Sequence, residues 1–342
     1  MKRQNPGGSS GQRRATACGA PSSAAGPQND PAEPSDDDRT LVEAIQREAE
    51  RQLSRPLAPG LSLVATPIGN LGDISLRAIA TIARSDIVLC EDTRHSRALA
   101  SHYGVRARLE AYHEHNAAEM RPRVLDWLAH GRRVALISDA GTPLISDPGF
   151  KLVRDALAAG HRVHAIPGPC AAVTALSSAG LPTDSFYFAG FLPPRNSARG
   201  ARIAELADIP ATLIFYEAPQ RVAEALADLA AILGPRPAVI ARELTKLNEE
   251  VQRGTLSNLA QMAASRDIKG EIVLLVGPPA EPQISDDIIR ARLATALASS
   301  SLRDAARAVA RDLGITKSRV YALGVDISRG TALNDPCDDG PE

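Results

Sequence analysis

The 342-residue chain is poor in aromatic residues and in cysteine, and its charges nearly balance. Phe, Trp and Tyr make up 3% of the residues, which leaves few rings for stacking on bases or on a macrocycle. The four cysteines are scattered without a CxxC spacing, which argues against a zinc site or a disulfide framework and is typical of a reducing cytosol. The net charge of -1 gives no overall basic field, so any contact with nucleic acid needs a local patch. We therefore expect a cytoplasmic protein without a metal site.

Long apolar segments are also absent. No apolar run is long enough to span a bilayer, and no apolar region follows Arg13-Arg14, so neither a membrane protein nor an export signal is indicated. Residues 2–40 contain no Val, Ile, Leu, Met, Phe, Trp or Tyr, and such a segment cannot offset its ordering entropy. We predict a disordered N-terminal tail over residues 1–57, with a short charged helix at 41–55.

Ordered structure is expected to begin near Leu61, where apolar runs start to alternate with helical patterns. Strands are predicted at 61–66, 87–90, 109–112, 134–138 and 163–166, and helices at 76–84, 93–103, 117–130 and 150–159. This alternation is typical of a parallel, doubly wound sheet. We assign residues 58–180 to a first α/β domain.

The pattern changes after Pro182. Strands are predicted at 186–188, 212–216, 238–243, 250–253 and 272–276, with helices at 220–233 and 256–264. The short spacing between 238–243 and 250–253 predicts antiparallel neighbours, so residues 181–278 form a second α/β domain with a mixed sheet. A proline-rich linker, 277–282, then precedes helices at 286–298, 302–313 and 317–324, which form a small C-terminal module over 283–330.

Four loops that follow predicted strands are rich in Gly, Pro and small polar residues: 65–73, 91–95, 138–149 and 167–172. In α/β proteins ligands bind outside the carboxyl ends of strands, and helix N-termini there expose free N–H groups. Gly141 and Gly149 permit positive φ and a close approach of the backbone to a ligand. The loops together predict a nucleotide-sized crevice. A GxGxxG after the first strand and a P-loop are both absent, which argues against the usual dinucleotide fold and against a P-loop NTPase.

The same loops resemble a known family. The run from Val64 to Ile74 resembles the start of the tetrapyrrole-methylase superfamily and, more narrowly, of the ribosomal RNA small subunit methyltransferase I family. Further matching segments are 91–95, 112–116, 138–149, 167–169, 180–184, 190–193, 215–217, 241–246 and 269–271. The likeness runs in order from about residue 61 to 277. One departure is Cys170, where the family usually has Ser.

The resemblance implies a two-domain tetrapyrrole-methylase-like α/β fold with S-adenosylmethionine in the cleft between the domains. It also implies a homodimer that methylates the ribose 2′-oxygen of a cytidine in the decoding region of 16S rRNA, within the small ribosomal subunit. Carried over by position, the expected cofactor contacts are Pro67, Ala140, Gly141, Thr142, Ile145, Cys170, Ala171, Glu217 and Ala241.

Methyl transfer from a sulfonium mainly needs alignment of the acceptor, and a general base would help to activate a weakly acidic ribose hydroxyl. The candidate bases are Glu91, Asp92, His113, His115, Glu217 and Glu243. We rank Glu91 and Asp92 first, because they stand at a strand end next to Arg94, which could grip a phosphate. An equally weighted alternative is that Asp92 caps the following helix. His113 and His115 share a face of their strand, but two ligands are too few for a metal.

Several basic residues are candidates for binding the RNA backbone: Arg94, Arg195, Arg199, Arg242 and Lys246. The alternative for Arg242 and Lys246 is a surface ion pair of little energetic weight. Residues 302–321 are typical of a helix-turn-helix, and the six Lys or Arg against three Asp or Glu within 299–329 favour RNA contact over a plain helical cap.

Two other functions stay open at this point. The first is a tetrapyrrole methyltransferase of the same superfamily, which would want a broader apolar cavity. The second is a non-enzymatic ribosome- or DNA-binding protein that uses the C-terminal helices, although it would leave the four small-residue loops unexplained.

Overall fold

The computed structural model describes residues 35–280 and 284–331. The predicted disordered tail over 1–57 lies outside these residues up to residue 34. Within the described part, helix α1 spans Asp36–Ser54, so the helix expected at 41–55 is present and residues 36–40 are helical as well. The helix thus begins earlier than predicted. The Ser35 hydroxyl accepts the N–H of Asp38 at 3.2 Å, and Asp36, Asp37 and Asp38 occupy the first turn, where carboxylates suit the positive end of the helix dipole. The local capping explains the early start.

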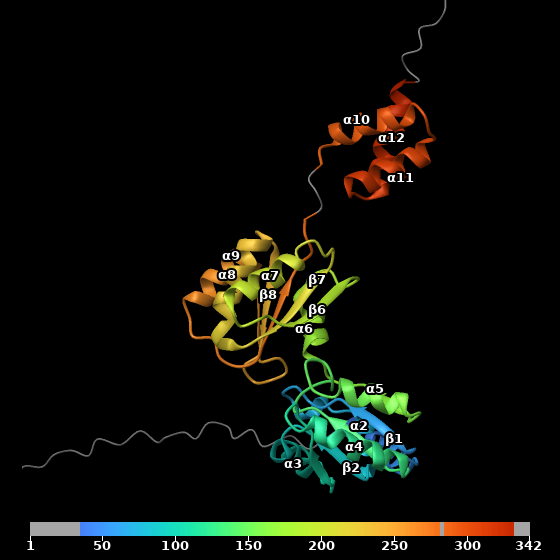
Figure 1. Cartoon of the computed structure of the whole chain (residues 1–342), viewed down its shortest axis with the longest axis vertical. Coiled ribbons are helices and arrows are strands. Elements are labelled where there is room, and N and C mark those ends of the chain that lie inside the picture. The colour runs from blue at the N-terminus through green and yellow to red at the C-terminus, as the bar shows by residue number, and fades with distance from the viewer. Residues whose placement is uncertain (1–34, 281–283, 332–342) are drawn as a thin grey trace, which may run out of the picture. The chain divides into compact units, whose positions relative to one another are not determined.

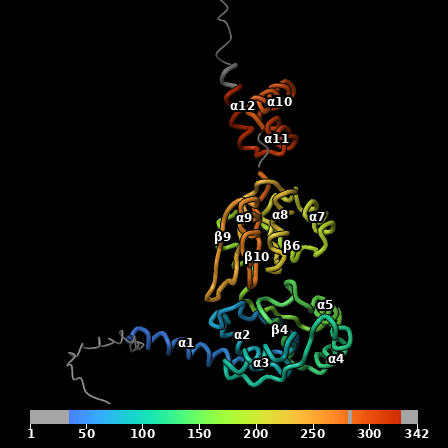
Figure 2. Tube along the Cα trace, turned by 90° about the vertical axis from the view of Figure 1, so that its left-hand side faces the viewer, coloured from blue at the N-terminus to red at the C-terminus, as the bar shows by residue number. Residues whose placement is uncertain are grey.

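The first sheet is parallel and has the strand order β3-β2-β4-β1-β5. Its strands are β1 (Gly60–Val64), β2 (Ile87–Cys90), β3 (Leu109–Ala111), β4 (Arg133–Ile137) and β5 (Val163–Ile166). Its helices are α2 (Leu76–Arg84), α3 (Thr93–His102), α4 (Ala117–Ala129) and α5 (Phe150–Ala158). Leu89 and Leu136 pack in one cluster with residues of α4 and α5, whereas Val88 and Ile137 pack in another with residues of α2. Figure 2 shows the trace of α2 to one side of β4 and those of α4 and α5 to the other. Helices on both faces confirm the predicted doubly wound sheet.

The second sheet is mixed and has the strand order β6-β7-β10-β8-β9. Its strands are β6 (Phe186–Phe191), β7 (Thr212–Glu217), β8 (Pro237–Arg242), β9 (Glu250–Thr255) and β10 (Ile272–Val276). Strands β6 and β7 are parallel, and β8 and β9 are antiparallel neighbours, as predicted. The helices are α6 (Ala171–Ala179), α7 (Asn196–Glu205), α8 (Val222–Leu233) and α9 (Leu256–Ala264), with 3₁₀ turns η1 (Leu71–Asp73) and η2 (Pro219–Arg221) in the chain.

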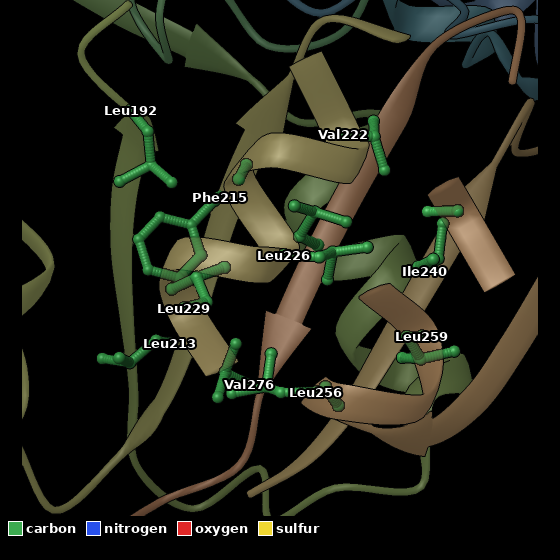
Figure 3. Packing of buried hydrophobic residues seen from close by; sticks show 14 of the residues in the cluster. Leu192, Leu213, Phe215, Val222, Leu226, Leu229, Ile240, Leu256, Leu259 and Val276 are labelled. Carbon is green, nitrogen blue, oxygen red and sulfur yellow. The ribbon is translucent and has the colours of Figure 1, made fainter. Parts of the chain in front are cut away.

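The alternation of buried residues along β7 divides the core of the second sheet into two layers. Leu213 and Phe215 pack with Leu226 and Leu229 of α8 on one face (Figure 3). Ile214 packs on the other face with α6, through Ala172, Ala175 and Leu176 among others. The predicted boundary at 180/181 stays a prediction, and the packing of α6 favours a boundary before that helix.

The C-terminal helices α10 (Asp286–Leu297), α11 (Leu302–Leu313) and α12 (Lys317–Thr331) lie together (Figure 1). They share a core of their own, built around Leu293, Val309 and Val320. Gly314 ends α11 in the left-handed conformation with φ 63°, as expected for a turn between helices. Helix α12 extends beyond the predicted 317–324, because Ile327 continues its apolar face. Among the described residues no helix is both long and apolar enough to cross a membrane.

Candidate functional site

A cavity of about 390 Å³ opens where both sheets bring strand ends together. Its walls come from the loops after β1, β4 and β5, from the end of β7 and from the start of β10. The volume falls within the range of roughly 300–1,000 Å³ that is common for small-molecule sites. The cavity therefore lies where a doubly wound sheet is expected to bind its ligand.

Most of the predicted cofactor residues line this cavity: Ala140, Gly141, Thr142, Ile145, Cys170, Ala171 and Glu217. Pro67 and Ala241 do not. Ile68 lines the wall in place of its neighbour Pro67, and Ala241 is fully buried in the layer beneath α6. The structure brings the other seven together, and their role in binding stays a prediction.

The loop after β4 is tied to two neighbouring loops by hydrogen bonds. The N–H of Thr66 donates to the carbonyl of Gly141 at 2.9 Å, and the N–H of Gly141 returns a bond to the carbonyl of Thr66 at 3.1 Å. The Thr142 hydroxyl donates to the carbonyl of Pro169 at 2.9 Å. Gly141 has φ 80°, and a Cβ there would lie 3.2 Å from Ile68 Cγ2. This position therefore favours glycine on both conformational and steric grounds.

Farther along the same loop, Leu144 and Ser146 adopt positive φ of 71° and 66°. Such a conformation costs about 1–3 kcal/mol at a residue other than glycine, and it clusters at functional sites. Ile145, Ser146 and Asp147 all line the cavity. The strained backbone thus belongs to the segment that forms the wall.

Glu217 ends β7 with a side chain that is 1% exposed. Its Oε1 accepts the N–H of Ala218 at 2.8 Å and pairs with the guanidinium of Arg221. Its Oε2 is buried and has no hydrogen-bond partner among the described residues. An unsatisfied buried acceptor costs about 1–3 kcal/mol, so a ligand that donates a hydrogen bond here gains by relieving that cost.

The N-terminus of α6 reaches the cavity through Cys170 and Ala171. Cys170 is the N-cap residue and makes no side-chain capping bond. The N–H of Ala172 donates to the hydroxyl of Tyr216 at 3.2 Å, and burial raises the pKa of Tyr216 so that this hydroxyl stays protonated. The positive end of the helix dipole suits an anionic group of a ligand.

Tyr216 and Phe191 form an aromatic part of the wall, with ring centroids 5.7 Å apart in an edge contact. Neither was among the predicted site residues, although both fall within segments that carried the family resemblance. Their role depends on the pairing of β6 with β7, which no local pattern in the sequence specifies.

Two aspartates, Asp139 and Asp147, add negative charge to the cavity. Burial, assisted by the nearby carboxylates of Glu91 and Asp139, raises the pKa of Asp147 to about 6, and a hydrogen bond from Ser138 opposes the shift. Burial and the charge of Asp139 also raise the pKa of Glu91. The carboxylates form no cluster that could hold a metal ion, and none occurs elsewhere in the described part of the chain. An acidic, partly desolvated wall favours a cationic ligand.

The predicted catalytic residues lie outside this cavity. Glu91 lines a second cavity, of about 470 Å³, which shares Ser146 and Asp147 with the first. Asp92 is the N-cap of α3: its Oδ1 accepts the N–H of Arg94 at 2.7 Å, and its Oδ2 accepts from the Arg94 guanidinium at 3.2 Å. These bonds lower the pKa of Asp92. The capping role weighed for Asp92 is therefore present, and the Arg94 side chain, 87% exposed, faces solvent.

The other candidate bases occupy different surroundings. Glu243 accepts the N–H of Glu271 at 2.9 Å and pairs with Lys246 at 2.9 Å, which lowers the pKa of Glu243 and fixes its carboxylate in a structural role. His113 and His115 stack edge to face at 6.0 Å between ring centroids. Neither histidine lines either cavity.

The prediction that Arg199 binds phosphate is wrong. Its side chain is 2% exposed, and it pairs with Asp228 at 2.6 Å and with Glu224 at 3.4 Å. Arg242 forms the predicted alternative, an ion pair with Glu250 at 3.0 Å. Arg195 is exposed at the N-cap of α7.

The family assignment comes from comparison with known proteins. Residues 60–260 match the family model described as tetrapyrrole (corrin/porphyrin) methylases. A protein of Mesorhizobium japonicum named ribosomal RNA small subunit methyltransferase I is 53% identical over 260 residues, covering 74% of this chain and 88% of its own length. The chain belongs to the ribosomal RNA small subunit methyltransferase I family. A second relative of the same name, from Vibrio cholerae, is 44% identical over 275 residues, covering 79% of this chain and 95% of its own length.

The crystal structure of a diphthine synthase shows the same fold, with a TM-score of 0.52 and 17% identity over 64% of this chain and 89% of that one. The family and the two-part α/β fold expected from the sequence are thus confirmed. As a member of the small subunit methyltransferase I family, the chain is a methyltransferase.

Proposed function

We propose that this family member transfers the methyl group of S-adenosylmethionine to the ribose 2′-oxygen of a cytidine in the decoding region of 16S rRNA, within the small ribosomal subunit. The observation that carries the proposal is the acidic cavity with the unpartnered Glu217 Oε2, in a chain whose relatives are named small subunit rRNA methyltransferases. The predicted cytoplasmic location and homodimer are part of this proposal.

The residues of the cavity fit S-adenosylmethionine. When bound, it supplies a methyl group activated on a sulfonium. Glu217 would accept a hydrogen bond from a hydroxyl or ammonium group, and the N-terminus of α6 at Cys170 and Ala171 would hold a carboxylate. The strand-end loop at Ala140, Gly141 and Thr142 would bind through its backbone, which agrees with its lack of bulky side chains. Asp139 and Asp147 favour the positive charge of this ligand.

The RNA part of the proposal has support outside the cavity. The exposed Arg94 guanidinium could contact a phosphate without losing its bond to Asp92. The C-terminal helices have a core separate from that of either sheet, and they carry Arg303, Arg311 and Lys317 in exposed positions. We propose that these helices contact RNA rather than the methyl donor.

A tetrapyrrole acceptor is the second candidate, favoured by the description of the matching family model. The cavity gives it less support, because Asp139, Asp147, Glu217 and Glu271 bring four carboxyl groups to a wall that is otherwise largely apolar. A planar macrocycle would want a broader apolar surface.

The test is transfer of radiolabelled methyl from S-adenosylmethionine to small ribosomal subunits that lack this modification, followed by nucleoside mapping. Label on a cytidine 2′-oxygen is expected. Label on a base would contradict the proposed ribose acceptor. No label on RNA, while the methyl donor still binds, would also contradict it and would favour a small-molecule acceptor. Deproteinised 16S rRNA in a parallel reaction shows whether the assembled subunit is required.

A further inference from the structure

The second cavity, of about 470 Å³, lies beside the first and belongs wholly to the elements around the first sheet. Ser146 and Asp147 line both cavities, so the two cavities adjoin at this short segment. A group held in the second cavity would thus lie next to whatever occupies the first. The arrangement matches what a transfer reaction requires, with the donor on one side and the acceptor on the other.

An exposed aromatic ring stands at the edge of the second cavity. Phe150, the first residue of α5, is 67% exposed and lines the cavity. Unstacked bases of single-stranded RNA are commonly bound by stacking on such a ring. Five aromatic residues are exposed among the described ones, and Phe150 is the most exposed of them.

The next residue, Lys151, is exposed, lines the same cavity and takes part in no ion pair among the described residues. Arg121, also in the wall, is instead paired with Asp155 at 3.0 Å. Among the described residues, Lys151 is therefore the cation of this cavity that has no ion-pair partner. An unpaired ammonium beside an exposed ring could bind the phosphate of a nucleotide whose base stacks on that ring.

The carboxylates complete the chemistry of the cavity. Asp147 stands in the shared wall, and Glu91 lines the second cavity only. Burial and neighbouring carboxylates bring the pKa of Asp147 to about 6, near the value that suits a general base at neutral pH. A carboxylate can also accept a hydrogen bond from the amino group of cytosine, which uracil lacks.

We propose that the second cavity receives the acceptor nucleotide: Phe150 stacks on its base, Lys151 neutralises its phosphate, and Asp147 accepts the proton of its ribose 2′-hydroxyl. The ribose oxygen forms the new O–C bond, and the S–C bond breaks with its electron pair left on sulfur. The hydroxyl proton passes to the Asp147 carboxylate. This inference rests on the proposed function and adds to it the place of the acceptor and the identity of the base.

The stacking role is tested by Phe150→Ala and Phe150→Trp in the full chain. Loss of one stacking contact predicts that Phe150→Ala raises KM for small subunits about tenfold, whereas Phe150→Trp stays near the wild-type value. S-adenosylmethionine affinity, measured by calorimetry, stays unchanged in both. Leu157→Ala is the matched control, because Leu157 is 56% exposed on the same helix and lines neither cavity. An unchanged KM in Phe150→Ala, with an active wild-type enzyme, overturns the acceptor site but leaves the proposed function standing.

The base and the phosphate contact need separate readouts. Lys151→Ala is expected to raise KM and to reduce the salt dependence of subunit binding, and an unchanged salt dependence would remove Lys151 from the site. Asp147→Asn is expected to lower kcat at least a hundredfold and to abolish the rise in kcat with pH near pH 6. If Glu91→Gln abolishes that rise and Asp147→Asn keeps it, the assignment of the base to Asp147 is wrong. A wild-type enzyme that methylates no RNA would instead refute the proposed function itself.

Discussion

Replacing Asp147 by Asn should stabilise the fold at alkaline pH while it removes activity. The pKa of Asp147 is about 6 in the folded chain, against its ordinary value of 3.8, chiefly because burial disfavours the charged carboxylate. A raised pKa means that the protonated form suits the folded state, and this contribution to stability is lost as the pH rises through 6. At pH 8 the wild-type chain therefore holds an unfavourable charge that the Asn variant lacks.

The magnitude follows from the size of the shift. A difference of about two pKa units corresponds to at most about 3 kcal/mol. Asp147 keeps partial contact with solvent, and screening reduces the expected gain to about 1–2 kcal/mol at pH 8. The gain should fall to about half at pH 5 and vanish near pH 3, where the carboxyl is protonated in both states.

The assay is thermal unfolding of the wild type and Asp147→Asn at pH 8 and pH 5, where each kcal/mol shifts Tm by roughly 2–4 °C for a domain of this size. Asp184→Asn is the matched control, because Asp184 is exposed and lines neither cavity. A variant no more stable than the wild type at pH 8, or a gain that is the same at both pH values, would show that the ionised Asp147 carboxylate does not destabilise the folded chain.

Three further predictions concern the ligand site, the buried ion pair of Arg199 and the C-terminal helices. Glu217→Gln should weaken S-adenosylmethionine binding about tenfold in calorimetry, because a hydrogen bond to a charged acceptor is worth about 1.5–3 kcal/mol, and unchanged affinity would remove Glu217 from the ligand site. Arg199→Met should lower the free energy of unfolding in urea by about 3 kcal/mol, since it leaves the Asp228 carboxylate without its buried partner, whereas wild-type stability would contradict the structural role of Arg199. A chain that ends at residue 282 should bind S-adenosylmethionine within twofold of the full chain and lose at least tenfold in subunit methylation, because α10, α11 and α12 have their own core. Full methylation by that chain would make the C-terminal helices dispensable.

The strands of both sheets could be predicted closely because hydrophobic runs of strand length are a local signal. Strands β2, β5 and β10 begin and end at the predicted residues. Helix α7 was missed, since its buried residues are only Arg199 and Ile203 and it shows no apolar stripe. Its burial is set by the ion pair of Arg199 with Asp228, which joins two helices far apart in the sequence. Because Asp228 is distant in the sequence, the sequence does not reveal that Arg199 is buried in an ion pair, and Arg199 was therefore predicted to be an exposed phosphate ligand.

The candidate site was only partly predictable. The loops that hold Ala140 to Thr142 and the start of α6 stand out in the sequence because small residues follow strands there, whereas the individual contact residues came from the family resemblance. Asp147 was missed as a candidate base, because the rise of its pKa comes from burial and from Glu91 and Asp139, which the fold brings near it. Ala241, a predicted cofactor contact, does not line the cavity, because α6 covers that face of β8 and the pattern of β8 does not reveal this.

A crystal structure of the full chain grown with S-adenosylmethionine would show directly where the methyl donor binds. We expect the ligand in the cavity lined by Gly141, Cys170 and Glu217, with a donor group within hydrogen-bond distance of Glu217 Oε2. A ligand bound elsewhere on the chain, or one that leaves Glu217 Oε2 without a partner, would contradict it.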